Sequence, residues 1–494
     1  MTVFSSINEF EYNGTFEGIR KDVIVSQMIK ALQKHFPSIC DKNYELSLFL
    51  PIFQRYILEN SSITHELDSE RIRLLNITEF TEFEDIQDND ALDDALLTKL
   101  ATVKLNDKVD SVIGKQSPLF EVKNGKCSLD IILQQIQNLN ISFNCDVPLI
   151  FITNPETESQ ISDFLRESYP CNKVEWKTLV HSSFPAIDKD TLLPAVFQMN
   201  VCEDDLWLSC GSGNLIDTLY FSGELDNLIV QGKEVLFVSN MENLGATVDL
   251  NILSYMITND INYLVEVVDR TANDSNTGVL ATYESTLRLV DYKYLSRESA
   301  RKCRTVNTNN IWINLRKLKN LIESDSLNLP ICSSETKTVI SNSQFMETLH
   351  LQTHLGDCIG FFSNSQVIKV PRNRFLPLAT CEDLFLLKSN LYDLDKNGIL
   401  SLYPLRFELL PSIKLGDEFD NYGTFKIGIP DIPNILELDH LTVTGNVFFG
   451  RKIILRGTVI IICDEDDVIT IPDGSILENV IVRNKSQLED IGQF

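Results

Sequence analysis

The stretch Val235–Ala246, which reads VLFVSNMENLGA, has residue types able to hold a phosphate ligand through a metal ion. Its first four residues form an apolar run that is too short for a helix and typical of a strand buried on both faces of a parallel sheet. A polar loop with one acid, Glu242, follows, and residues 248–256 have helical apolar spacing. Ligands of open α/β sheets bind outside the carboxyl ends of such strands, where a carboxylate can hold a metal that bridges to phosphate. The alternative, an acid that only caps the next helix, fits these residues equally well.

The elements that must position this loop alternate between strand-like and helix-like patterns over residues 101–390, which predicts an α/β layered domain. The expected strands are Ala101–Leu105, Val147–Thr153, Val235–Val238, Leu264–Val268 and Val279–Tyr283, and the expected helices cover 129–139, 161–167, 248–256 and 384–394. The central loop is therefore expected at the carboxyl edge of a sheet.

The two ends of the chain have a different character. Residues 1–100 predict a helical N-terminal segment, with Ile24, Met28 and Leu32 on one face, and the acid-rich stretch 66–94 is expected to be a solvated helical surface. From residue 411 to the end, apolar residues recur every six positions, in the series 441, 447, 453, 459 and 443, 449, 455, 461. That period predicts a parallel β-helix, whose exposed edge suits oligomerisation.

Composition excludes several classes of protein. The chain has 494 residues, more than one ordinary core requires, and its net charge of −27 argues against nucleic-acid and anionic-membrane partners. The 11 cysteines are scattered and never spaced as CxxC, so reduced thiols in the cytoplasm are expected rather than disulfides or zinc. We expect no signal peptide and no transmembrane segment.

Four stretches of the chain resemble the eukaryotic UTP–glucose-1-phosphate uridylyltransferases, also called UDP-glucose pyrophosphorylases. They are VSNMENLGATVDLNIL (238–253), VNTNNIWINL (306–315), VPRNRFLPL (370–378) and LELDHLTVTGNVFFG (436–450). The resemblance implies a Rossmann-like nucleotidyltransferase domain over 101–400 and a left-handed parallel β-helix over 411–494. It also implies the reaction of UTP with glucose 1-phosphate to UDP-glucose and pyrophosphate, with Mg²⁺, and assembly through the β-helix.

The resemblance also assigns roles to individual positions. It places the nucleotide at Leu105, Asn106, Asp107, Lys108, His181 and Gly211. It places the rest of the substrate at Ser212, Asn240, Met241, Glu242, Asn310 and Gln352, with Glu242 as the metal ligand. The positions of a phosphate-binding and a catalytic lysine of the family are occupied by Leu119 and Ala379.

Several of these polar positions keep a structural alternative. The run Asn307–Asn310 faces the sugar by resemblance, or forms a strand-end turn satisfied by its own amides. Arg372 and Arg374 hold phosphate or neutralise acidic neighbours. Without a visible partner, His181 favours a structural role over proton transfer. Gly213 and Gly211 frame the uridine or belong to an ordinary loop.

The sequence departs from the family where phosphate charge must be neutralised. Nucleotidyl transfer depends on positioning and on charge neutralisation. Asp107, Lys108 and Asp110 replace three glycines of a phosphate loop, where side chains obstruct the approach of backbone amides. Losing one transition-state donor typically lowers a rate by about 10²–10³. We therefore expect weak uridylyltransferase activity; the alternative is a catalytically inactive homologue that regulates or assembles with an active relative. Lys108 could partly compensate if its stem finds room, and Lys115 lies nearby in the sequence.

Overall fold

The computed structural model describes most of the chain. The described residues are 16–35, 43–59, 68–86, 94–106, 117–169, 174–195, 207–274, 278–341, 344–406, 410–464, 467–484 and 487. The expectations for Asp107, Lys108, Asp110 and Lys115 lie outside the described residues.

An eight-stranded sheet forms the centre of the molecule, in the order β2-β18-β12-β15-β11-β3-β6-β7. Its strands are parallel except β15, which is antiparallel to both of its neighbours. β11 is buried from Val235 to Ser239, which confirms the strand expected from its apolar run. The bounds are β2 (Thr81–Glu82), β3 (Leu100–Leu105), β6 (Leu149–Thr153), β7 (Trp176–Val180), β11 (Val235–Asn240), β12 (Tyr263–Asp269), β15 (Thr305–Asn314) and β18 (Ser365–Lys369).

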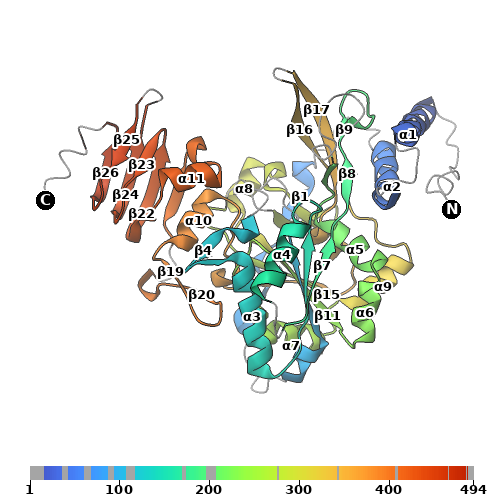
Figure 1. Cartoon of the computed structure of the whole chain (residues 1–494). Helices are drawn as coiled ribbons and strands as arrows, with labels where there is room; N and C mark the ends of the chain where they lie inside the picture. The colour runs from blue at the N-terminus through green and yellow to red at the C-terminus, as the bar shows by residue number, and fades with distance from the viewer. Residues whose placement is uncertain are drawn as a thin grey trace.

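Helices cover both faces of this sheet (Figure 1). On one face lie α3 (Ser128–Phe143), α4 (Glu158–Ser168) and α7 (Leu250–Thr258), whose apolar residues pack against Phe151 and Trp312. On the other face lie α5 (Leu215–Phe221), α6 (Glu224–Val230) and α9 (Leu315–Glu323), which share a core with Ile150 and Val238. Alternate residues of each strand thus enter two separate cores, as a covered parallel sheet requires.

The N-terminal helices α1 (Phe16–His35) and α2 (Asn43–Glu59) lie beside β8 and the long β16–β17 hairpin (Figure 1). Phe49 and Phe53 of α2 share an apolar cluster with Phe184 and Leu351, and Met28 and Leu32 of α1 belong to the same cluster. The strands concerned are β8 (Ser183–Pro185), β9 (Ile187–Asp188), β10 (Trp207–Ser209), β16 (Cys332–Ser341) and β17 (Gln344–Gln352).

The C-terminal part consists of two small parallel sheets. Strands β21, β22, β24 and β26 form one sheet in that order, and β23 pairs with β25 in the other. The residues of both six-residue series are buried, which confirms that this period marks a shared core. The bounds are β21 (Ser412–Leu415), β22 (Asn434–Thr444), β23 (Val447–Phe449), β24 (Ile454–Ile462), β25 (Ile469–Ile471) and β26 (Ile476–Val482).

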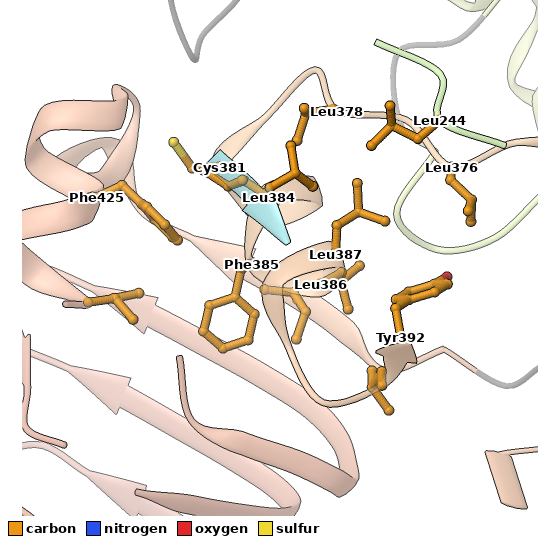
Figure 2. Close-up of a cluster of buried hydrophobic side chains, with 14 of the residues drawn as sticks. Leu244, Leu376, Leu378, Cys381, Leu384, Phe385, Leu386, Leu387, Tyr392 and Phe425 are labelled. Carbon is orange, nitrogen blue, oxygen red and sulfur yellow. The ribbon is translucent and has the colours of Figure 1, made fainter. Parts of the chain in front are cut away.

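An apolar cluster joins the central region to these C-terminal sheets. Figure 2 shows Leu384 and Phe385 of α10 (Cys381–Lys388) close to Phe425 of α11 (Tyr422–Gly428), above the C-terminal strands. Leu244 and Leu376 lie at the other end of the same cluster. The central loop and the C-terminal sheets therefore share one continuous core, so changes in either affect the packing of the other.

Two expectations about secondary structure were wrong. Within residues 68–99 the described chain forms short 3₁₀ turns and the strands β1 (Ile72–Leu74) and β2, not the expected solvated helix. β2 joins the edge of the central sheet beside β18, so strand pairing overrides an acidic composition that suits helices. The helix expected over 384–394 ends at Lys388, because residues 392–394 pair with β20 instead.

The remaining elements complete the scaffold around the site. They are β4 (Glu121–Lys123), β5 (Lys126–Cys127), β13 (Val279–Tyr283), β14 (Thr286–Val290), α8 (Arg297–Lys302), β19 (Tyr392–Leu394) and β20 (Leu400–Leu402). Every cysteine in the described ranges is a free thiol. A search of the same ranges found no helix that is both long and apolar enough to cross a bilayer.

Candidate functional site

Four adjacent parallel strands end at one edge of the central sheet. These are β11, β3, β6 and β7, whose last residues are Asn240, Leu105, Thr153 and Val180. The half of β15 that carries Asn307–Asn310 lies at the same edge, because β15 runs antiparallel there beside β11 and β12. Of the residues expected to bind the nucleotide and the sugar, Leu105, Asn240 and Asn310 therefore meet at the carboxyl edge, where open α/β sheets bind ligands.

The loop after β11 is held in place by Asn243. The Asn243 side chain donates to Asn310 Oδ1 (3.0 Å) and to the Arg374 carbonyl (3.2 Å), and accepts from the amides of Gly245 (3.1 Å) and Leu376 (2.9 Å). These bonds tie the loop to β15 and to residues 374–376. Asn240 is half-buried, and Met241 and Glu242 are buried. Glu242 is thus presented from a rigid loop and not from a mobile one.

Gly245 lets this loop touch the segment 373–375. A Cβ on Gly245 would lie 2.4 Å from the Asn373 carbonyl oxygen and 2.8 Å from the Arg374 carbonyl carbon. Because both atoms belong to the backbone, we expect Gly245→Ala to lower the free energy of unfolding by about 1–3 kcal/mol. Urea denaturation would measure this loss. Gly423→Ala, an exposed position in α11 with its nearest contact at 3.2 Å, is the control and is expected to change stability by less than about 1 kcal/mol. Equal stabilities of the two variants would contradict the close approach.

A buried ion pair lies directly behind the loop. Glu266 of β12 is completely buried and accepts from Arg374 Nε (2.8 Å) and from the terminal Nη2 of the same guanidinium (2.6 Å). The Asn310 amide (3.0 Å) and the Trp312 indole N–H (2.8 Å) also donate to Glu266. Arg372 similarly binds Asp274 through two hydrogen bonds of 2.7 and 2.8 Å. Both arginines therefore neutralise acidic neighbours, which answers the alternative that the sequence left open.

The run Asn307–Asn310 makes many of its hydrogen bonds within the protein. Asn307 donates to Asn309 Oδ1 (2.7 Å), and the Thr308 hydroxyl donates to the Glu266 carbonyl (2.8 Å). Asn309 has a φ of 57°, a left-handed conformation that asparagine tolerates. Asn310 bridges Asn243 and Glu266 and thereby links the loop to the buried ion pair. This geometry favours a positioning role for Asn310, and its contact with a sugar stays a prediction.

The Gly211–Gly213 turn packs directly on the end of β17. A Cβ on either glycine would lie 2.4 Å from an oxygen of Thr353, and Gly211 has a φ of +83°. The Gly213 amide donates to the Thr353 carbonyl (2.9 Å), and Ser212 Oγ accepts from the Leu355 amide (3.1 Å). Gln352 is the last residue of β17; it is half-buried, and its side-chain Nε2 lies 3.0 Å from His350 Nδ1. The turn and Gln352 are therefore brought together, as the resemblance implies.

His181 lies where β7 ends, and Ser182 beside it accepts a hydrogen bond from the buried Cys210 thiol at its carbonyl (2.9 Å). The His181 side chain is buried, and neither ring nitrogen has a hydrogen-bond partner among the described residues. Burial lowers the pKa of His181 from 6.5 to about 4. The imidazole is therefore neutral at pH 7 and has an acceptor and a donor for a ligand.

Acid is expected to destabilise the protein through His181. Its folded pKa of about 4 is below the unfolded value of 6.5, so the unfolded state binds more protons between these values. The contribution of His181 to the free energy of unfolding is therefore complete above pH 6.5 and is lost as the pH falls toward 4. The expected loss between pH 7.5 and pH 5 is about 2 kcal/mol. Urea denaturation at both pH values would detect the loss. In His181→Gln, the fall in the free energy of unfolding between these pH values is expected to be smaller by about 2 kcal/mol. The same pH dependence in that variant would contradict this assignment.

The two positions where the resemblance implies lysines, Leu119 and Ala379, are both half-buried. Leu119 is half-buried and packs against the large apolar cluster that includes α3 and α10. Ala379 is also half-buried, and its amide donates to Asp383 Oδ2 (3.0 Å) at the start of α10. At the end of β3, Leu105 is buried, and the side chain of the next residue, Asn106, donates to Thr157 Oγ1 (3.3 Å). Neither Leu119 nor Ala379 contributes a positive charge to the edge.

Glu242 is the carboxylate expected to hold Mg²⁺. Within the described ranges, no group of three or more His, Cys, Asp and Glu side chains is arranged to hold a metal. Mg²⁺ in phosphate-transfer sites is commonly held by one or two carboxylates together with substrate phosphates, so a single buried carboxylate at this edge fits such an ion. The donor set does not suit a metal held by protein alone.

Sequence reasoning missed two charged residues behind the site. Glu266 interrupts the apolar run YLVEVV, and Lys104 lies in the buried strand LATVKL. A charge inside an otherwise apolar strand was the available signal, because such a group requires partners. Lys104 Nζ donates to Ser239 Oγ (2.8 Å) and to the Ala246 carbonyl (2.7 Å), so it fastens the end of the same loop.

Comparisons with known proteins agree with this arrangement. The family model for UTP–glucose-1-phosphate uridylyltransferase matches residues 46–456. A probable UTP–glucose-1-phosphate uridylyltransferase of Saccharomyces cerevisiae is 67% identical over 494 residues, 100% of both chains. A UTP–glucose-1-phosphate uridylyltransferase of the same yeast is 40% identical over 96% of this chain and 97% of its own.

Solved structures give the same result for the fold. The UDP-glucose phosphorylase of Trypanosoma brucei superposes with a TM-score of 0.81 at 27% identity, over 93% of this chain and 100% of that chain. The UDP-glucose pyrophosphorylase of Leishmania major superposes with a TM-score of 0.81 at 27% identity, over 94% and 99%. With the strand-end loop, the glycine turn and the family match over most of its length, the chain belongs to the UTP–glucose-1-phosphate uridylyltransferase family.

Proposed function

We propose that this chain is a slow UTP–glucose-1-phosphate uridylyltransferase. The observation that carries the proposal is the arrangement of the site. The hydrogen bond between Asn243 and Asn310 and the close-packed Gly211–Gly213 turn are present, whereas Leu119 and Ala379 supply no positive charge. A solved structure of a mutant of the Leishmania major relative is described as a complex with UDP-Glc. That ligand is the product expected here.

The proposed reaction needs no covalent intermediate on the protein. A phosphate oxygen of glucose 1-phosphate attacks the α-phosphorus of UTP, and the bond to the bridging oxygen breaks to release pyrophosphate. Gly211 and His181 accept the nucleotide, while Asn240 and Gln352 lie toward the sugar. Glu242 would hold Mg²⁺, which supplies positive charge to the phosphates. Asn243 and Asn310 keep Glu242 in place through the bonds that they make to each other and to residues 374–376.

The activity test uses Glu242. Purified protein at high concentration, with UTP, glucose 1-phosphate and Mg²⁺, is expected to form UDP-glucose slowly. Removing the carboxylate charge in Glu242→Gln is expected to lower that rate about 10-fold or more, because the metal contact is lost. Glu121→Gln, which removes an exposed acid on β4, is the control. Full activity of Glu242→Gln would contradict the role of Glu242 as the metal ligand. Complete absence of UDP-glucose with the parent chain would exclude uridylyltransferase activity.

A second candidate, a catalytically inactive homologue that assembles with an active relative, has its own supporting observation. β26 is the last strand of the described C-terminal sheet, and its residues Ile476 and Ile481 are 49% and 52% exposed. We propose that this part is a left-handed β-helix, residues 411–494, and that its edge forms homo- or hetero-oligomers. An uncovered apolar strand edge suits such a contact.

Light scattering tests this assembly. The parent chain, alone or mixed with the 40% identical yeast relative, is expected to form oligomers, and Ile481→Glu is expected to shift them to smaller species. Val230→Glu, at an 86% exposed residue of α6, is the control that is expected to leave assembly unchanged. A monomer in both preparations would exclude assembly through this edge.

The proposal includes the organisation of the chain and its compartment. We place an N-terminal segment at 1–100, the nucleotidyltransferase domain at 101–400 and the oligomerisation domain at 411–494. The free thiols among the described residues support a reducing compartment, the cytoplasm.

A further inference from the structure

A cavity of about 230 Å³ lies on the α3 face of the central sheet, behind the loop that carries Glu242. Its floor consists of Thr102 and Lys104 of β3 and Phe237 of β11. Ile136 and Leu139 of α3 form one wall, and residues 246–248 form another. The cavity is larger than an engineered 150 Å³ cavity that binds benzene, so it has room for a ring with a short substituent.

Apolar side chains surround the mouth of the cavity. Phe143 at the end of α3 is 38% exposed, and Ile399 in the turn before β20 is 40% exposed. Both line the cavity, beside the polar side chains of Ser142 and Asn397. An exposed apolar rim above a hollow is a feature of ligand pockets rather than of an ordinary surface.

The floor has a lysine that forms no ion pair among the described residues. Lys104 is 1% exposed, and its Nζ donates to a hydroxyl and a backbone carbonyl, both uncharged. Among the described residues no carboxylate lies within 4.0 Å of this Nζ, and Glu266 on the same face is already bound by Arg374. An ammonium has three N–H donors, so one remains after these two bonds. A buried cation of this kind favours an anionic partner.

We propose that this cavity binds a small carboxylate with an aromatic body, the ring between α3 and Phe237 and the carboxylate at Lys104. Phe143, which is 38% exposed, supplies an aromatic face for the ring at the mouth, and Phe237 lies in the floor below it. The site is separate from the nucleotide edge, because it lies on the α3 face of the sheet and none of the loop residues Asn240–Asn243 lines it.

The protonation of Lys104 agrees with this assignment. Burial and the nearby Arg374 lower the pKa of Lys104 to about 7, while Glu266 raises it. Asp249, which lies 3.7 Å from Arg374, is the other charged group of this cluster among the described residues. A bound carboxylate would stabilise the protonated lysine, so affinity is expected to fall by up to about 10-fold per pH unit above pH 7.

The probe for this site is trans-cinnamate, with neutral cinnamamide as its matched control. Ligand-observed NMR titration of the full chain is expected to give a Kd for cinnamate of about 0.1–1 mM, and binding of cinnamamide at least about tenfold weaker. Equal binding of the two compounds, or no binding of cinnamate, would overturn the proposal. Saturating UDP-glucose is expected to leave cinnamate bound, and competitive displacement would place the ligand at the nucleotide edge instead.

Variants locate the site. Ser142→Trp fills the mouth from an exposed position and is expected to weaken cinnamate binding at least about tenfold, since the ring loses its space. Ile141→Trp, on the same helix at a 55% exposed residue that does not line the cavity, is the control with unchanged binding. Lys104→Met, if it folds, is expected to bind cinnamate and cinnamamide equally. Undiminished binding by folded Ser142→Trp would overturn the proposal, whatever the folding of Lys104→Met.

Discussion

The double variant Leu119→Lys/Ala379→Lys is expected to form UDP-glucose about 100-fold faster than the parent chain or more. Each lysine adds a donor that becomes most favourable as charge develops on the phosphates, and one such donor typically changes a rate by about 10²–10³. Two donors acting on one transition state are not additive, so the lower end of the combined range is expected. Steady-state measurement of UDP-glucose and pyrophosphate formation would detect the gain.

The surroundings of both positions allow this substitution. Leu119 and Ala379 are half-buried, and Leu119 packs against the apolar cluster, so a lysine stem at 119 can lie along apolar side chains while its ammonium stays hydrated. The control is Leu119→Met/Ala379→Gln, which has similar length and no charge, and which is expected to leave the rate unchanged. A folded lysine variant with the parental rate would contradict the claim that these two positions limit turnover.

Breaking the buried pair behind the loop is expected to have the largest effect on stability. Glu266→Gln would remove the completely buried carboxylate that binds Arg374 and leave its guanidinium with the more distant Asp249, 3.7 Å away. Removing one partner of a buried ion pair typically costs about 3–5 kcal/mol. Urea denaturation followed by fluorescence would measure this loss, with Trp312 beside Glu266 as a reporter.

An exposed pair provides the comparison for this prediction. Lys302 and Glu298 of α8 also form an ion pair, but their side chains are 69% and 78% exposed. Glu298→Gln is therefore expected to change stability by less than about 1 kcal/mol. Similar losses for the two variants would contradict the conclusion that Glu266 and Arg374 form a structural unit behind the Glu242 loop.

The sequence was sufficient to predict four strands of the central sheet, β3, β6, β11 and β12, and the period of the C-terminal core. β11 and β6 are short apolar runs bounded by polar turns, and such runs have few alternatives in an α/β protein. The six-residue spacing of buried residues from Leu441 to Ile461 could be predicted because parallel pairing of β22 with β24 and of β24 with β26 buries these residues in one core. The apolar runs and the six-residue spacing are both local patterns that recur along the sequence.

The parts that could not be predicted depend on contacts between distant segments. In residues 68–86, β1 pairs with β13, about 200 residues later, and β2 pairs with β18, nearly 300 residues later. The roles of Arg372 and Arg374 were undecided, because their partners Asp274 and Glu266 lie about 100 residues away. Residues 107–116, which include Lys108 and Lys115, lie outside the described residues, so the roles expected for Lys108 and Lys115 stay predictions.

The central claim is that this chain keeps the framework of a sugar-nucleotide enzyme but has lost charges that act on the triphosphate. Its most direct test compares kcat/KM for UDP-glucose formation with that of the 40% identical yeast relative, under the same conditions. We predict a value at least about 10³-fold lower for this chain, because two donors are absent. A value within about tenfold of the relative would contradict the claim.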